Sequence, residues 1–206
     1  MKKIIALIVA LVMCLSCTVA FAASPVIEGT FSFDTATFQN VFNMLAEKLE
    51  LTYQWEAETR YDYGYPMYVC VNEDRTVAIS LHENGGVFAF EVDSFVDMNA
   101  TAEEATAAGE KFGTAMALLS LTVYVCEHGA VDTTIQSELN NCLVGLSELM
   151  MQMDSMTEEQ MKQGVDYVVN VAEYPTCVQL TLQDTANGQQ LWMAYMLLNA
   201  ASSFAE

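Results

Sequence analysis

The run from Phe112 to Cys126 contains no charged residue, and it constrains the fold more than any other stretch of the sequence. It lies in a longer segment, 102–127, that is predicted to be helical because Thr101 and Glu104 have the spacing of an N-terminal capping box. The 15 uncharged residues would rise only about 22 Å as a helix, which is short of the ~30 Å core of a bilayer. A helix that is apolar on all sides must be covered by the rest of the chain. We therefore expect 102–127 to be a buried central helix.

The spacing of apolar residues predicts further helices and two groups of strands. Recurrence every three to four residues predicts helices at 34–50, 133–152 and 157–163. Alternation with a period of two predicts strands, at 51–56, 67–71, 77–81 and 86–92 before the central helix and at 165–172, 176–183 and 189–198 after it. Residues 57–66 are predicted to be a loop, and 189–198 has a pattern that a helix would satisfy equally well.

The grouping of the strands determines the predicted fold class. Because the strands come in runs and do not alternate with helices, the sequence predicts an α+β fold with antiparallel strand meanders. The meanders flank a central pair of helices, one of which is buried. Asn187 and Gly188 form a turn sequence typical of a β-hairpin. No proline-rich or low-complexity linker divides the chain, so residues 23–206 are expected to form a single domain.

The first 22 residues have the three parts of a bacterial secretory signal peptide. Lys2 and Lys3 form a positive region, residues 4–13 are wholly apolar, and 20–22 supply the small residues that a signal peptidase recognises. The apolar run is too short for a comfortable membrane span. We therefore expect residues 1–22 to be removed and the remainder to be secreted or extracytoplasmic, without a transmembrane segment.

The cysteines fall into two groups. Cys14 and Cys17 lie in the predicted signal peptide, and acylation of either would give a lipid-anchored form. That alternative is weaker, because the residues that precede them do not match a lipid-attachment motif. The others have no zinc-ligand spacing and allow three disulfide pairings; they are Cys70, Cys126, Cys142 and Cys177. A Cys70–Cys177 bridge would require their strands to adjoin, whereas Cys126 and Cys142 are expected to be buried free thiols.

The charge of the chain excludes two classes of partner. The formal net charge is −20, and it becomes −22 when Lys2 and Lys3 are removed. So acidic a protein repels phosphate backbones, and we expect it to bind no nucleic acid. Anionic membrane surfaces are disfavoured for the same reason. The acidity is interpreted as a solvated surface that keeps the protein soluble.

The sequence carries no catalytic motif. His82 and His128 are the only histidines, and neither a nucleophile elbow, a zinc-protease motif nor a phosphate-binding glycine loop is present. Cys126 and His128 are two residues apart, so on a helix their side chains point in different directions. We therefore expect no enzyme activity and no cofactor. An extracytoplasmic hydrolase with an unrecognised site, in which His82 would be the first candidate, is an alternative.

Two patterns raise the alternative of metal binding. The segment that starts at Asp93 matches a calcium-binding loop only in part, because it lacks the required glycine and one ligand. Thioethers, in contrast, suit Cu(I), and five methionines are close together in sequence: Met150, Met151, Met153, Met156 and Met161. Core packing or a flexible apolar contact is the favoured interpretation of these methionines. The alternative function is an acidic, methionine-rich metal-binding protein.

The best candidate for a binding surface is a segment rich in aromatic residues. Tyr61, Tyr63 and Tyr65 alternate in a predicted loop, close to Trp55. Aromatic rings offer a large apolar area at low entropic cost, and loops on a rigid scaffold often carry binding residues. Packing against the core is the competing interpretation. The sequence thus favours a binding or interaction module whose partner is a protein or a glycan.

Overall fold

The structure is a computed structural model. It describes residues 29–60, 65–72, 75–81, 85–129, 133–153, 155–171 and 173–199, and it describes no side chain in 57–76 or at 133. The predicted signal peptide at 1–22, with Cys14 and Cys17, lies outside the described residues. Tyr61, Tyr63 and His82 do as well.

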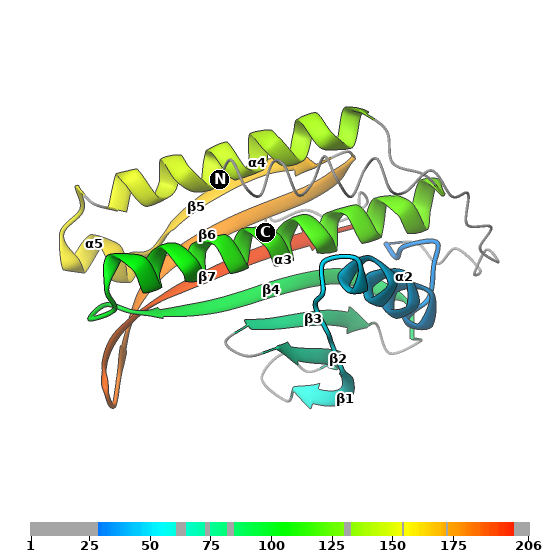
Figure 1. Cartoon of the computed structure of the whole chain (residues 1–206), viewed down its shortest axis with the longest axis horizontal. Coiled ribbons are helices and arrows are strands. Elements are labelled where there is room, and N and C mark those ends of the chain that lie inside the picture. The colour runs from blue at the N-terminus through cyan, green and yellow to red at the C-terminus, as the bar shows by residue number, and fades with distance from the viewer. Residues whose placement is uncertain are drawn as a thin grey trace.

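The chain forms an α+β fold with one open antiparallel sheet, as predicted (Figure 1). The helices are α2 (Thr35–Glu47), α3 (Ala102–His128), α4 (Thr133–Met153) and α5 (Glu158–Gln163). The strands are β1 (Trp55–Arg60), β2 (Tyr65–Asn72), β3 (Arg75–Leu81), β4 (Val87–Asp97), β5 (Val165–Val171), β6 (Tyr174–Thr185) and β7 (Gly188–Leu198). Their order in the sheet is β1-β2-β3-β4-β7-β6-β5.

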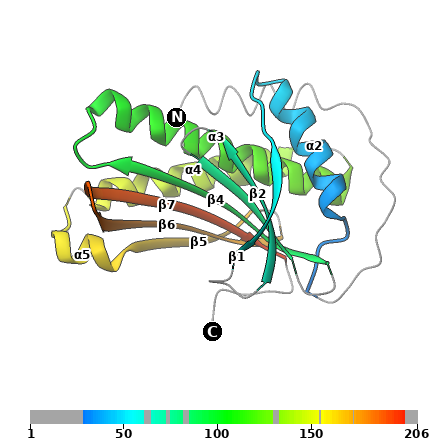
Figure 2. The same ribbon diagram turned by 90° about the horizontal axis from the view of Figure 1, so that it is seen from below.

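The two predicted meanders lie side by side in this single sheet. They join where β4 pairs with β7 in a single seven-stranded sheet, and Figure 2 shows β4, β7, β6 and β5 as neighbours in one layer. The helices α2, α3 and α4 lie on one face of that layer (Figures 1 and 2). The segment 189–198, for which strand and helix were both open, is a strand because it pairs with β4 on one side and β6 on the other.

Two local predictions were wrong in detail. The predicted loop at 57–66 is shorter, because β1 continues to Arg60, whose backbone pairs with Tyr65 of β2. The residues before Arg60 lack an apolar alternation, so the hydrophobic pattern ended this strand too early. In the hairpin between β6 and β7, Gly188 is a strand residue with a φ of 133° that pairs with Thr185, and the turn lies one residue earlier than predicted.

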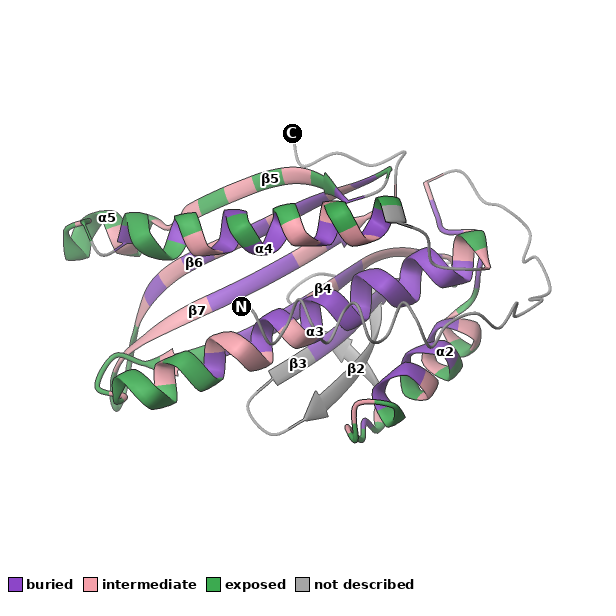
Figure 3. Cartoon of the chain, turned by 45° about the horizontal axis from the view of Figure 1, so that its top comes forward, coloured by how far each residue is buried: buried purple, intermediate pink, exposed green. Residues whose placement is uncertain are grey.

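The helix α3 is the buried centre of the protein, as its uncharged sequence predicts. Every residue from Phe112 to Cys126 except Thr114 is buried, which Figure 3 shows as the long purple part of this helix. Its buried hydroxyl groups are satisfied within the helix: Ser120 Oγ donates to the Met116 carbonyl at 2.9 Å, and Thr122 uses the carbonyl four residues earlier in the same way. Burial of these residues therefore leaves no hydroxyl donor of the helix interior unpaired.

An aromatic cluster fixes α2 to the sheet. The Phe38 ring lies at its centre, fully buried, with its centroid 4.3 Å from that of Phe90 on β4. The other rings of the aromatic cluster are Phe31, Phe33, Phe42, Tyr53, Trp55 and Tyr174. Offset and edge-on ring pairs of this kind add to the free energy gained from burying their area. The cluster thus joins the N-terminal segment, α2 and both meanders.

The N-cap of α2 should make the stability of the protein depend on pH. Asp34 Oδ1 accepts a hydrogen bond from the Thr37 N–H at 2.8 Å, and this bond is the main reason that the pKa of Asp34 lies below its usual 3.8. A lowered pKa stabilises the fold above the unfolded-state pKa, and the contribution is lost as the pH falls through the folded-state value. We expect Asp34→Ala to lower the free energy of unfolding by about 1 kcal/mol near neutral pH. Urea unfolding should show that the difference in free energy of unfolding between Asp34→Ala and the unmodified protein is smaller at about pH 2.5 than near neutral pH.

The variant Asp34→Asn is the matched control for this prediction, because it keeps an acceptor oxygen and removes the charge. Its loss near neutral pH should be much smaller than that of Asp34→Ala. A loss in Asp34→Ala that is the same at both pH values would contradict a contribution from the ionised carboxylate.

The positions of the cysteines settle the open alternatives. Cys126 and Cys142 are buried free thiols, as predicted, and Cys177 is also free. Burial raises the pKa of Cys142 to about 12 and that of Cys177 to about 11, so these thiols stay protonated at neutral pH. Cys70 in β2 and Cys177 in β6 are separated by β3, β4 and β7, which places their strands about 19 Å apart. A Cys70–Cys177 disulfide is therefore excluded.

Candidate functional site

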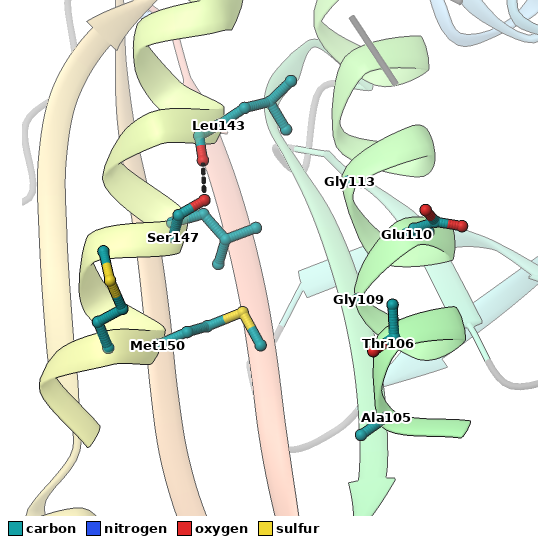
Figure 4. Close-up of a pocket in the computed structure, with 10 residues that line it drawn as sticks. Ala105, Thr106, Gly109, Glu110, Gly113, Leu143, Ser147 and Met150 are labelled. Atoms are coloured by element: carbon teal, nitrogen blue, oxygen red, sulfur yellow. Dashed lines mark hydrogen bonds between the residues drawn. The ribbon is translucent and has the colours of Figure 1, made fainter. Parts of the chain in front are cut away.

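An apolar groove lies between α3 and α4, and we call it the interhelix groove. Its volume is about 380 Å³. Figure 4 shows its two walls, with α4 on one side and α3 on the other. It is lined by Ala105, Thr106, Gly109, Glu110, Gly113, Leu143, Leu146, Ser147, Met150 and Met151. A hollow of this size, with an apolar lining and few polar groups, is typical of a binding site.

The groove exists because its two walls have side chains of different size. Ala105, Gly109 and Gly113 recur every fourth residue of α3, so they share one face of that helix. The facing wall on α4 carries larger apolar side chains, including Leu146 and Met150. A Cβ atom added to Gly109 would meet no atom within 4 Å, which shows that the space in front of this residue is open. Each wall extends over about 12 Å, or two helical turns.

The groove has one charged side chain in its lining. Glu110 is part of its lining, and Glu103 lies seven residues earlier on the same face of α3. Glu148 on α4 and Lys111 on α3 each follow a lining residue in the sequence, but neither lines the groove. No lysine or arginine lines the groove where the structure describes it. The charge of the described lining is therefore negative.

A second hollow adjoins the groove and is lined almost entirely by methionine. Its volume is about 230 Å³. We call it the methionine hollow; its lining residues are Met98, Met150, Met151, Met153, Met161 and Leu191, two of which also line the groove. Met98 is 48% exposed, Met150 37% and Met151 64%. Core packing describes Met153, which is buried, and Met156 and Met161, which pack against the core. Met150 and Met151 reach solvent, as the favoured interpretation allows for a flexible apolar contact.

Sequence reasoning did not include Met98 in the methionine cluster. It precedes α3, whereas the other four methionines lie on α4 and α5. The backbone N–H of Met98 donates to the Gln189 carbonyl of β7 at 3.0 Å, and this contact brings Met98 to the hollow. No local pattern in the sequence marks it, because the contact joins residues that are far apart in the chain.

The predicted aromatic site is described only in part. Trp55 is half-buried in the aromatic cluster, edge-on to Phe42 with the ring centroids 5.3 Å apart, and its Nε1 donates to Asn43 Oδ1 at 3.1 Å. Trp55 therefore helps to pack α2 on the sheet. Tyr65 is the first residue of β2, and only its backbone is described. Tyr61 and Tyr63 lie outside the described residues.

The region around Cys126 and His128 does not contain an activated nucleophile. Burial, together with the adjacent Glu127 carboxylate, raises the pKa of the Cys126 thiol, which disfavours the reactive thiolate. His128 Nε2 lies 3.5 Å from Glu173 Oε1 and 3.5 Å from the Tyr174 hydroxyl. A positive charge at the C-terminal end of α3 is favoured by the helix dipole. These contacts explain the position of His128 without chemistry.

The acidic residues that partly matched a calcium loop have other roles. Asp93 lies within β4 and accepts a hydrogen bond from Trp192 Nε1 at 2.8 Å. Glu104 forms the capping box with Thr101. Across the described ranges, no group of three or more histidine, cysteine, aspartate or glutamate side chains is placed to hold a metal ion. None of the described helices combines the length and the hydropathy needed to cross a membrane.

Comparisons with known proteins add no family and no relative. No protein-family model matches the sequence, and no curated protein or solved structure is significantly similar to it. The interhelix groove and the methionine hollow are the candidate binding sites of the described structure.

Proposed function

We propose that this protein is an extracytoplasmic, non-catalytic binding module that holds a cationic amphipathic helix of a partner protein in the interhelix groove. The observation that carries the proposal is an open apolar groove of about 380 Å³ whose lining contains one glutamate, Glu110, and no basic residue. Recognition of an amphipathic helix by an apolar groove is a recurring mode of peptide binding. Residues 1–22 support an extracytoplasmic location.

The length of the groove walls matches about two turns of a bound helix. Glycine and alanine on the α3 wall allow another backbone to come close, as small residues do at helix–helix contacts. Two turns of wall accommodate apolar anchors at positions i, i+3 or i+4, and i+7 of the bound helix. The flexible side chains of Met150 and Met151 can adjust to anchors of different shape. A lysine or arginine beside the anchors would be able to pair with Glu110.

The tyrosine segment is a second candidate surface of the same module. Tyr65 starts β2, at the edge of the sheet formed by the β1–β2 hairpin. The groove lies between α3 and α4, so a protein or glycan bound at Tyr61, Tyr63 and Tyr65 would use a separate site. This surface draws its support from the sequence alone.

A groove-filling variant tests the helix-binding proposal. The probe is a synthetic 20-residue helical peptide with leucine at i, i+3, i+4 and i+7 and lysine on the opposite face. Gly109→Leu places a side chain in open space within the groove, so we expect it to weaken peptide binding at least about tenfold. Isothermal titration calorimetry measures the affinity. Unchanged affinity in Gly109→Leu would overturn the proposal.

Two controls separate groove filling from other effects. Gly109→Ala adds only a methyl group and a better helix former, so it should raise the free energy of unfolding by about 1 kcal/mol and leave much of the binding intact. Glu110→Lys should weaken binding at low salt more than Glu56→Lys, which makes the same charge change at an exposed position on β1. If a peptide with glutamate in place of lysine bound equally well, charge complementarity would be excluded.

A further inference from the structure

We infer that the methionine hollow is a binding site for Cu(I), with the thioether sulfur atoms as ligands. Five of the six residues that line the hollow are methionines, and they come from the loop before α3, from α4 and from α5. Ordinary core packing does not explain this concentration, because Met98, Met150 and Met151 are 48%, 37% and 64% exposed. The inference does not depend on the helix-binding proposal.

The chemistry of the lining selects a soft cation. Thioether sulfur is a soft, uncharged ligand that suits Cu(I), whereas Mg²⁺, Ca²⁺ and Mn²⁺ prefer carboxylate and carbonyl oxygen. Each methionine side chain has three rotatable bonds, so the sulfur atoms can close around an ion that is much smaller than the hollow. Ag(I) has the same charge and softness, and it is a redox-inert probe of the same site.

Contacts with the β6–β7 hairpin hold two of the ligand-bearing segments in place. Gln189 of β7 accepts from the Met98 N–H at 3.0 Å, and its side-chain Nε2 donates to Glu158 Oε1 of α5 at 2.6 Å. Lys162 Nζ lies 2.9 Å from Glu158 Oε1 and 2.7 Å from Asp184 Oδ2, which ties α5 to β6. Met98 and Met161 are thus attached to neighbouring points of the β6–β7 hairpin. A site whose supporting backbone is fixed binds an ion at a lower entropic cost.

The surrounding charges favour a cation. Lys162 is the basic residue of α5, and two carboxylates contact it, so this local group carries a net negative charge. The whole chain has a formal net charge of −20. An entering monovalent cation is therefore attracted to this end of the molecule. No anionic ligand in the hollow is needed, because the protein itself supplies the opposite charge.

Where the structure describes their side chains, the cysteines and the histidine do not line the hollow. Burial keeps the thiols of Cys126 and Cys142 protonated, and the thiolate is the form that binds metals. His128 is far from the hollow, because it lies at the C-terminal end of α3. It is about 39 Å along the helix from Ala102, the first residue of α3, which follows Met98 by four positions. Binding should therefore depend on methionine and not on cysteine or histidine.

The test is a titration of the purified protein with Cu(I) under anaerobic, reducing conditions, in competition with a chromogenic Cu(I) chelator. We expect one ion to bind per chain. The variant Met98→Leu/Met151→Leu/Met161→Leu should lose at least about tenfold in affinity, because leucine keeps the volume and removes the ligands. Met156→Leu is the matched control, since Met156 packs against the core and does not line the hollow. Its affinity should equal that of the unmodified protein.

Two further measurements keep the result interpretable. The single variant Met151→Leu changes a side chain that is mostly exposed, so it should not unfold the protein. It should nevertheless weaken the binding of Cu(I). Thioethers do not titrate, so the affinity should be the same at about pH 5 and about pH 7.5, whereas histidine or thiolate ligands would lose the ion at the lower pH. Absence of binding, unchanged affinity in the triple variant, or loss of the ion at about pH 5 would each overturn the inference.

Discussion

We expect Phe38→Ala to lower the free energy of unfolding by about 3–5 kcal/mol, which is the usual cost of removing a buried phenylalanine. The Phe38 side chain is fully buried and contacts the rings of Phe33, Phe42, Trp55 and Phe90. Its removal would leave a cavity between α2 and β4. The rigid rings around the cavity cannot collapse into it, so little of the lost contact would be recovered.

Urea unfolding monitored by circular dichroism measures this cost. Phe38→Leu should be less destabilising, because leucine fills part of the space. Asn40→Ala, on the exposed side of the same helix, should change the free energy of unfolding by less than about 0.5 kcal/mol. If Phe38→Ala cost no more than Asn40→Ala, the packing of α2 on the sheet would be wrong.

The second large effect concerns a buried hydrogen bond between the central helix and the sheet. Tyr195 is fully buried on β7, and its hydroxyl oxygen lies 2.6 Å from Ser120 Oγ. Ser120 already donates its proton to the Met116 carbonyl, so we infer that the tyrosine hydroxyl is the donor to Ser120. Burial raises the pKa of Tyr195 far above its usual value, so the phenol stays neutral.

We expect Ser120→Ala to lower the free energy of unfolding by about 1–3 kcal/mol, because it leaves the buried Tyr195 hydroxyl without an acceptor. Tyr195→Phe should cost less, since Ser120 keeps its hydrogen bond to the helix carbonyl. The double variant should be less destabilised than the sum of the two single variants. Urea unfolding of all four proteins gives the coupling. Strict additivity would show that the hydrogen bond does not contribute.

The elements of the fold were predictable where a segment had a strong period of its own. The uncharged run from Phe112 to Cys126 predicted the buried helix, and the alternation of Val178, Leu180 and Leu182 predicted β6, whose apolar face is buried as expected. The end of β1 was missed because polar residues extend it through pairing with β2. The pairing of β4 with β7 was out of reach as well, because neither strand carries a signal for its distant partner.

The candidate sites were less predictable than the fold for the same reason. Four methionines of the hollow attracted notice because they lie close together in sequence, but Met98 reaches them only through its contact with β7. The interhelix groove depends on the relative position of two helices, and the small residues of α3 alone do not reveal what faces them. The tyrosines of the predicted aromatic site are a sequence signal whose side chains lie outside the described part of the structure.

The junction between β4 and β7 sets the order in which this fold can form. Ala89 pairs with Leu198 and Asp97 pairs with Gln190, so the centre of the sheet joins residues roughly a hundred positions apart. Each meander can form from local hairpins. The two meanders can join only when β4 pairs with β7, which closes a loop of roughly a hundred residues, and non-local pairing of this kind slows folding. During synthesis, β4 would leave the ribosome long before β7 and would wait with an open edge. A chaperone that covers β4 would protect the nascent chain at its most aggregation-prone stage.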